Sequence, residues 1–175
     1  MKGIVIYEGK YGATAQYASW LADALYLRVV NADRQSTSNL AQFDYVIVGS
    51  PVYMGKLMIK DWLEANEWVL LNKKLFLFIV SSASPDDKAR QENVLKNNLP
   101  EALANIVQVF FLQGRVVINK LSLKDRLIVR FGAMMEKDPE KKALMRRGFD
   151  GVKKENITDL VKNVLKFSTA EEVLI

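Results

Sequence analysis

Short, continuous apolar runs alternate along this chain with segments of helical periodicity. The runs have the length of strands and are rich in β-branched or aromatic residues; they span residues 4–7, 45–49, 75–80 and 107–112. A continuous apolar run is typical of a strand that is buried on both faces of a parallel sheet. Strands that alternate with helices predict βαβ units, and therefore a parallel sheet with helices on both faces.

The weaker segments complete the same pattern. A fifth strand is expected at 28–32, followed by a loop or short helix over 33–43. Ser84 and Pro85 suit the N-cap and the first position of a helix. In the C-terminal helix, Leu165 is expected on the apolar side. Apolar residues at spacings of three and four predict further helices over 14–25, 58–71 and 156–167.

Length and composition bound the number of domains. The chain has 175 residues, half of them apolar, which is enough for one buried core. We predict a single α/β domain over residues 1–175, a three-layer sandwich in which a central five-stranded parallel sheet has helices on both faces. A basic helical insertion is expected at about 115–150, near the C-terminus.

The chain contains neither cysteine nor histidine, and this excludes several kinds of chemistry. Disulfides, thiolate nucleophiles, Cys-ligated zinc or iron–sulfur clusters, and haem ligated by His or Cys are impossible. Ser-His-Asp hydrolysis and acid–base catalysis by imidazole are impossible too. We predict no catalytic residue and no metal site, because no residue stands out for either role. Any redox chemistry must therefore be carried by an organic cofactor.

The apolar segments are too short for a membrane span. None approaches the roughly 20 residues that cross a bilayer, and the N-terminal run is too short for the core of a signal peptide. We therefore expect a protein that is soluble or at most peripheral, in the cytoplasm.

Positive charge is concentrated in residues 115–154. This segment holds twelve Lys or Arg against five Asp or Glu, whereas the net charge of the whole chain is +5. The segment is interpreted either as a solvated surface or as a docking face for an acidic partner or anionic lipid. Nucleic acid is not expected as a partner.

A helix predicted over 123–135 lies within the basic segment. Lys124, Arg126 and Arg130 fall away from its apolar face. Two interpretations stay open: the apolar face packs on the domain, or it meets a membrane surface or the groove of a partner. The residues of that face are Leu123, Leu127, Ile128, Phe131, Met134 and Met135.

Ligands of open parallel sheets bind outside the carboxyl ends of the strands. The loop after the first strand contains Gly9, Lys10, Tyr11, Gly12, Ala13 and Thr14. Glycines allow a ligand to approach the backbone, and the first N–H groups of the following helix favour an anion. Thr14 adds a hydroxyl group. The loop is either a phosphate site or an ordinary turn in which Thr14 is the N-cap.

The loops after the next two buried strands carry the other candidate binding residues. In the second loop, Pro51 stiffens the turn, Gly55 allows an unusual backbone angle, and Tyr53 can stack on a planar ring. Alternatively, Tyr53 packs on the neighbouring helix. The third loop has no aromatic residue. The candidates are Ser50, Pro51, Val52, Tyr53, Met54 and Gly55 in the second loop, and Ser82, Ala83 and Ser84 in the third.

The first two loops resemble those of a known family. Residues Tyr7-Glu8-Gly9-Lys10-Tyr11-Gly12-Ala13-Thr14 resemble the flavodoxin phosphate loop, in which an aromatic residue precedes x-[Ser/Thr]-x-x-Gly-x-Thr. Residues Gly49-Ser50-Pro51-Val52-Tyr53-Met54-Gly55 resemble the G-x-P-x-Y-x-G loop of flavodoxin-like proteins. The resemblance covers most of the chain and implies a flavodoxin-like fold that binds FMN through the three candidate loops. Because the third loop has no aromatic residue, it also implies that the second face of the flavin is open to a substrate or quinone, unless Tyr11 covers it. It departs at Gly9, where the family has Ser or Thr; Lys10 either compensates for the lost hydroxyl or is solvated.

The segment after the last strand resembles a more specific group. Gln113-Gly114-Arg115, Lys120-Leu121-Ser122 and Asp125-Arg126-Leu127 are similar to the insertion of menaquinone-dependent protoporphyrinogen oxidases. The resemblance implies an enzyme of haem biosynthesis that passes electrons from an organic substrate to a quinone, with peripheral membrane contact through residues 115–154. Two alternatives stay open: a flavodoxin-type FMN electron carrier that docks to redox partner proteins, and a non-redox binding domain that has lost FMN.

Overall fold

The computed structural model describes residues 1–34, 37–82 and 87–170. Five parallel strands form its central sheet in the order β2-β1-β3-β5-β6, and a short strand, β4, pairs antiparallel with the end of β3. The prediction of a five-stranded parallel sheet is therefore confirmed. The strands are β1 (Gly3–Tyr7), β2 (Arg28–Asn31), β3 (Tyr45–Tyr53), β4 (Lys56–Leu57), β5 (Lys74–Ser81) and β6 (Gln108–Gln113).

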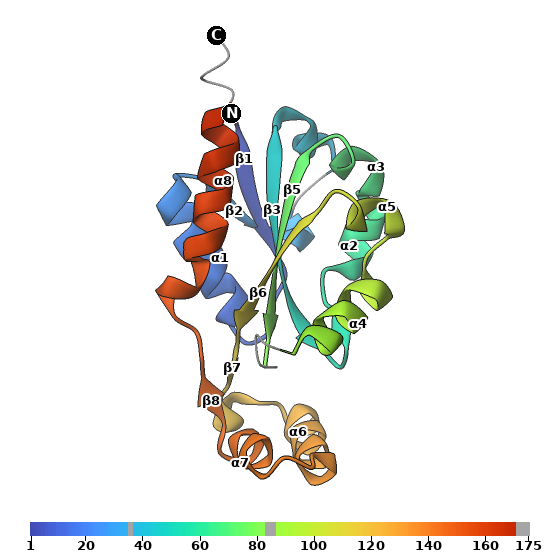
Figure 1. Cartoon of the computed structure of the whole chain (residues 1–175), viewed down its shortest axis with the longest axis vertical. Coiled ribbons are helices and arrows are strands. Elements are labelled where there is room, and N and C mark those ends of the chain that lie inside the picture. The colour runs from blue at the N-terminus through green and yellow to red at the C-terminus, as the bar shows by residue number, and fades with distance from the viewer. Residues whose placement is uncertain (35–36, 83–86, 171–175) are drawn as a thin grey trace.

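Helices cover both faces of the sheet, as predicted (Figure 1). Alternate residues of the same strand face opposite sides, so Val46 and Val48 join one core and Ile47 joins the other. The helices on one face are α1 (Ala13–Leu25) and α8 (Thr158–Ala170); those on the other are α2 (Lys60–Ala65), α3 (Glu67–Leu70), α4 (Lys88–Asn98) and α5 (Glu101–Ala104). Turns of 3-10 helix are found at Ala32–Arg34, Thr37–Gln42, Ile118–Lys120 and Lys154–Ile157.

Three predictions for the helices need correction. The helix expected over 58–71 is interrupted at buried Asn66, whose side-chain amide donates to the carbonyl of Trp62, 2.8 Å away. Helix α4 begins at Lys88 with Asp87 as its N-cap. Ser84 and Pro85, which were predicted to start this helix, lie outside the described residues. Leu165 is 47% exposed, because it follows buried Val164 and therefore points about 100° away from it.

An insertion lies beyond the carboxyl ends of the strands (Figure 1). It leaves and re-enters the sandwich through two short strands that pair antiparallel with each other. Between them the chain forms two helices, of which the first coincides with the helix predicted over 123–135. The elements are β7 (Arg115–Val116), α6 (Leu123–Met135), α7 (Pro139–Arg147) and β8 (Phe149–Asp150).

The apolar face of α6 is exposed, so the interpretation that it packs on the domain is wrong. Five of its large apolar side chains are between 61% and 79% exposed: Leu123, Leu127, Phe131, Met134 and Met135. Ile128, which was assigned to the same face, is instead half-buried and turned toward the sandwich. Within the described residues, no helix is long and apolar enough to cross a bilayer.

Candidate functional site

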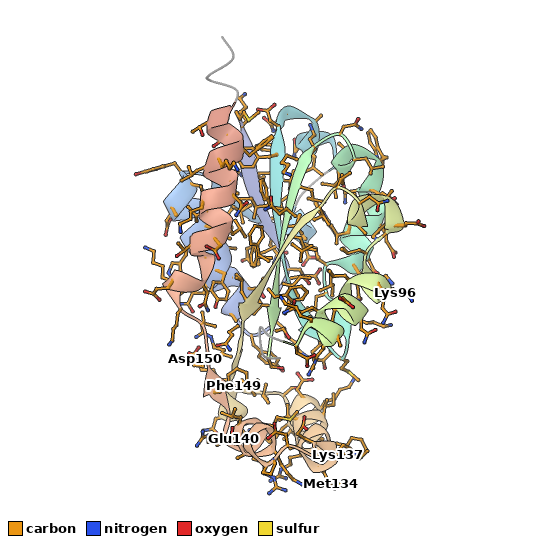
Figure 2. The ribbon with its side chains drawn as sticks, in the orientation of Figure 1. Lys96, Met134, Lys137, Glu140, Phe149 and Asp150 are labelled. Carbon is orange, nitrogen blue, oxygen red and sulfur yellow. The ribbon has the colours of Figure 1, made fainter. Side chains whose placement is uncertain are left out.

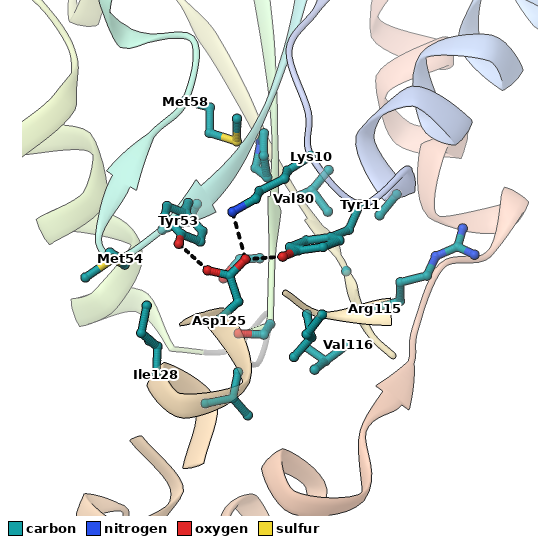
Figure 3. A pocket seen from close by; sticks show the side chains of 18 of the residues that line it. Lys10, Tyr11, Tyr53, Met54, Met58, Val80, Arg115, Val116, Asp125 and Ile128 are labelled. Carbon is teal, nitrogen blue, oxygen red and sulfur yellow. Dashed lines mark hydrogen bonds and ion pairs between the residues drawn. The ribbon is translucent and has the colours of Figure 1, made fainter. Parts of the chain in front are cut away.

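A cavity of about 310 Å³ lies between the carboxyl ends of the strands and the insertion (Figure 3). All three predicted loops contribute to its wall. Gly9, Gly12 and Ser50 are not among its lining residues, and Ala83 and Ser84 lie outside the described residues. The predicted residues that line it are Lys10, Tyr11, Ala13, Thr14, Pro51, Val52, Tyr53, Met54, Gly55 and Ser82.

The first loop presents the N-terminus of α1 without a side-chain cap. The N-cap is Gly12, with φ of 85°, and no side chain accepts a hydrogen bond there. Thr14 therefore is not the N-cap; it lies in the first turn, lines the cavity and is 2% exposed. The N–H groups of a first helical turn have no partner inside the helix, and with the Thr14 hydroxyl they make a donor set that suits a phosphate.

Gly9 packs against Thr14 instead of facing the cavity. A Cβ atom at position 9 would lie 3.1 Å from the Cβ of Thr14. A serine or threonine there, as in the related phosphate loops, would therefore require Thr14 to shift. The departure from the family pattern at this position accompanies a close contact between the loop and the first turn of α1.

The second loop is a tight hairpin between β3 and β4. Met54 and Gly55 have φ of 51° and 77°, and Tyr53 pairs with Lys56 across the turn. Two successive residues with positive φ are typical of a two-residue hairpin of type I′. The turn places the side chain of Tyr53 on the cavity and confirms that Gly55 has an unusual backbone angle.

Hydrogen bonds from the sandwich fix the base of this hairpin. The side-chain amide of Asn98 donates to the carbonyl of Gly55, and its oxygen accepts from the N–H of Leu57, both at 3.0 Å. The hydroxyl of Ser50 is buried and accepts from the N–H of Ile59 at 3.2 Å. Ser50 thus holds the backbone and does not present its side chain to a ligand.

The rest of the site is organised around Asp125 of α6, which sequence reasoning missed. Its carboxylate accepts hydrogen bonds from the hydroxyl groups of Tyr11 and Tyr53 and pairs with the ammonium group of Lys10 at 2.7 Å (Figure 3). Tyr53 therefore does not simply pack on a neighbouring helix. Two roles were expected for Lys10, to compensate at the phosphate for the missing hydroxyl or to be solvated. It has neither role here, because it is paired with Asp125 and its cation lies 4.7 Å from the centre of the Tyr53 ring.

One local signal for Asp125 was present in the sequence. Ser122 and Asp125 have the spacing of a capping box, and the Ser122 hydroxyl accepts from the N–H of Asp125 at 3.2 Å. This spacing predicts the start of a helix. It does not predict that the carboxylate turns away from its own backbone to two loops more than 70 residues earlier.

The charges of the cluster stabilise one another. Hydrogen bonds from Lys10, then from Tyr11 and Tyr53, hold the pKa of the Asp125 carboxyl well below its usual range. The same contact with Asp125 raises the pKa of Lys10. At neutral pH the cluster therefore contains one carboxylate and one ammonium group.

The acid stability of the protein tests this cluster. Because the pKa of Asp125 is lower in the folded than in the unfolded chain, its contribution to stability is fully present above the ordinary value of 3.8 and is lost below it. Between about pH 5 and about pH 2, the free energy of unfolding should therefore fall more for the wild type than for Asp125→Asn. Urea denaturation at each pH measures both curves. Parallel curves would show that Asp125 is not held in its charged form.

Several proteins of known structure are similar to this chain. Solved structures similar to this chain include a flavodoxin from the domain Archaea (15% identity, covering 93% of this chain and 99% of that chain, TM-score 0.46). A second is the flavodoxin, WrbA-like protein from Agrobacterium tumefaciens (22% identity, covering 83% of this chain and 97% of that chain, TM-score 0.47). A third is two-electron reduced Megasphaera elsdenii flavodoxin (15% identity, covering 82% of this chain and 95% of that chain, TM-score 0.48). No curated protein matches the sequence.

A family model identifies the chain more directly. The model of the flavodoxin domain matches residues 4–143, from β1 into α7. The match includes all strands of the central sheet, both loops that carry the resemblance and most of the insertion. The chain belongs to the flavodoxin domain family.

Proposed function

We propose that this chain is an FMN-binding oxidoreductase whose cofactor occupies the cavity at the carboxyl ends of the strands. The observation that carries the proposal is the meeting of two features on one cavity: the uncapped N-terminus of α1 and the hairpin that presents Tyr53. Backbone N–H groups from Gly12 onward and the hydroxyl of Thr14 would hold the phosphate. The ring of Tyr53 would support the isoalloxazine. FMN, when bound, supplies the capacity to accept and release electrons.

Purification tests the cofactor directly. We expect the full chain to be yellow or to become so with added FMN, and heat should release FMN that chromatography identifies. Protein that stays colourless and does not quench the fluorescence of added FMN would contradict the proposal. It would favour the third interpretation, a binding domain that has lost the cofactor.

Substitution of Thr14 tests the place of the phosphate. Thr14→Val preserves the shape of a buried side chain and removes its hydroxyl. A hydrogen bond to a charged group contributes about 1.5 kcal/mol or more, so FMN should bind about tenfold more weakly. Riboflavin lacks the phosphate, and its affinity should not change; equilibrium fluorescence titration measures both. An equal loss for the two ligands would place the phosphate elsewhere.

We further propose that the electrons come from an organic substrate and pass to a quinone, as in menaquinone-dependent protoporphyrinogen oxidases. The insertion supports this, because Val116, Ile128, Val129 and Met145 add apolar walls to the cavity. Such walls suit a planar apolar molecule. Anaerobic mixing of the flavin-loaded protein with protoporphyrinogen and a soluble quinone tests the substrate. Porphyrin formation at no more than the uncatalysed rate would contradict it.

The electron carrier is the alternative, and one observation favours it. Met54, at the tip of the hairpin beside Tyr53, is 66% exposed, so a redox partner protein can reach this edge of the cavity. Electron transfer between proteins requires such an accessible edge rather than an enclosed substrate site. Rapid reduction by a flavodoxin reductase, together with no turnover of porphyrinogen, would support the carrier over the enzyme.

The exposed face of α6 also supports peripheral contact with a membrane that contains anionic lipid. Apolar side chains on one helical face, flanked by Lys124, Arg130 and Lys137, are typical of a helix that lies in a lipid surface. Figure 2 shows Met134 and Lys137 at the end of the insertion that is farthest from the sheet. A quinone acceptor dissolved in the bilayer would then be close to the cavity.

Vesicle binding tests this contact. The wild type should sediment with vesicles that contain phosphatidylglycerol and much less with phosphatidylcholine alone. Replacing both Leu127 and Phe131 by serine should weaken binding by at least about tenfold, because each buried apolar side chain contributes about 1.5 kcal/mol or more. The matched control replaces Trp68 and Leu165, exposed apolar residues of the sandwich. Equal losses in the two double variants would contradict the role of α6.

A further inference from the structure

Asp125 is the only charged side chain among the fully buried residues of the described chain. It is 3% exposed, although the outer face of its own helix is open to solvent. Burial of a carboxylate is unfavourable unless hydrogen bonds and a counter-charge compensate for the lost water. Lys10, Tyr11 and Tyr53 supply both. These three donors therefore form a binding site whose geometry fits a carboxylate.

The donors and the carboxylate come from different parts of the molecule. Lys10 and Tyr11 belong to the loop after β1 and Tyr53 to the hairpin after β3, whereas Asp125 belongs to the insertion (Figure 3). The insertion joins the sandwich through the two short strands β7 and β8. Movement of the insertion about these two strands would withdraw the Asp125 carboxylate without disturbing the sheet that holds the donors.

The donors also contact one another without the help of the carboxylate. The Lys10 cation lies 4.7 Å from the ring centre of Tyr53 and 5.4 Å from that of Tyr11, within the range of cation–π attraction. Withdrawal of Asp125 would leave this cation and two phenolic hydroxyl groups facing the cavity. Such a group of donors favours an anion.

The wall next to the cluster determines what else a ligand must contain. Met58, Val116, Ile128 and Val129 line the same cavity. Figure 3 shows Asp125 between the donors and two of these residues, Val116 and Ile128. A molecule with both an apolar body and a carboxylate would satisfy both parts of the site. A small inorganic anion would leave the apolar wall without a partner.

We propose that Lys10, Tyr11 and Tyr53 form a subsite for the carboxylate of an organic acid with an apolar body, and that Asp125 occupies this subsite in the ligand-free protein. That such acids are the substrates of the oxidoreductase rests on the proposed function. Binding of the carboxylate itself needs no flavin. A tethered ligand competes at a high effective concentration, so an external acid must displace Asp125 and with it the start of α6.

Calorimetric titration of the full chain, without flavin, tests the subsite. The probe is benzoate, and benzamide is its uncharged counterpart. Benzoate should bind Asp125→Ala at least about tenfold more tightly than the wild type, because the internal competitor is gone. The affinity for benzamide should differ little between Asp125→Ala and the wild type. No gain for benzoate, or an equal gain for benzamide, would overturn the proposal.

Two further variants separate the subsite from a general effect on folding. Asp125→Ala combined with Lys10→Met removes both members of the ion pair and leaves neither charge buried alone, so the chain should fold and the added affinity for benzoate should disappear. Glu140→Ala, an exposed acid of α7, is the matched control and should bind benzoate as the wild type does. Retained tight binding in the double variant would overturn the assignment of Lys10.

Hydrogen exchange of the wild type tests the internal occupant. Saturating benzoate should speed the exchange of the α6 amides, because Asp125 no longer holds the helix to the two loops. Unchanged exchange while benzoate binds would overturn this role. The proposed function fails separately: a chain that binds benzoate as expected but does not bind FMN contradicts only the flavin site.

Discussion

Tyr53→Ala should bind FMN up to about a hundredfold more weakly than the wild type. Stacking of a planar base on an aromatic side chain contributes about 1–3 kcal/mol, and the isoalloxazine is a ring system of comparable kind. The hairpin fixes the backbone position from which the Tyr53 ring reaches the cavity. The redox potential should also rise, because the electron-rich face of a phenol opposes the addition of electrons to a stacked ring. Fluorescence titration and spectroelectrochemistry measure the two effects.

The matched variant Tyr53→Phe separates the ring from its hydroxyl group. It retains the aromatic face and loses only the hydrogen bond to Asp125. FMN affinity in Tyr53→Phe should therefore stay close to that of the wild type. A loss as large as that of Tyr53→Ala would mean that the contact with Asp125, and not the ring, determines affinity. Unchanged affinity and potential in Tyr53→Ala would place the isoalloxazine elsewhere.

Much of the fold could be predicted because the sheet is parallel and covered on both faces. Strands such as β5 are apolar on both sides, so they are visible as runs without any knowledge of their neighbours. The interruption at Asn66 was not visible. It occurs at Asn66, a buried polar residue whose side chain bonds the carbonyl of Trp62, and such an interruption is compatible with the apolar spacing of a continuous helix.

The position of the site could be predicted for a similar reason, but its internal contacts could not. The loops after β1 and β3 had to meet at one edge of the sheet, and they do. Asp125, in contrast, reaches this edge only because β7 and β8 turn the insertion back over it. Helical periodicity showed which residues share a face of α6. It could not show that this face stays exposed while Asp125 is buried.

Gly49 shows that a motif residue can be required by the core instead of the ligand. The residue begins the G-x-P-x-Y-x-G loop, yet it lies within β3, paired with Phe78 of β5. A Cβ atom at this position would lie 2.1 Å from the Cζ atom of the Phe78 ring, which is fully buried. The absence of a side chain at Gly49 is therefore what lets this ring lie across β3.

Gly49→Val should consequently lower the free energy of unfolding by about 3 kcal/mol or more. Extra carbon atoms in a packed core typically cost about 1–3 kcal/mol, and here the clash is with an aromatic ring that has little free space to enter. Because β3 continues from Gly49 to Tyr53, FMN affinity should fall as well. Urea denaturation measures the stability, and fluorescence titration of the folded variant measures the affinity.

A double-mutant cycle assigns the cause of that loss to the ring of Phe78. Phe78→Leu removes the atoms that a side chain at position 49 would meet, at the cost of a cavity in the wild-type background. Combined with Gly49→Val, the leucine should make the double variant more stable than the sum of the single changes predicts, with a coupling of about 1 kcal/mol or more. Phe76→Leu, in the same strand and the same core, is the matched control and should show no such coupling. Additive effects at positions 49 and 78 would show that Gly49 is needed for a reason other than contact with this ring.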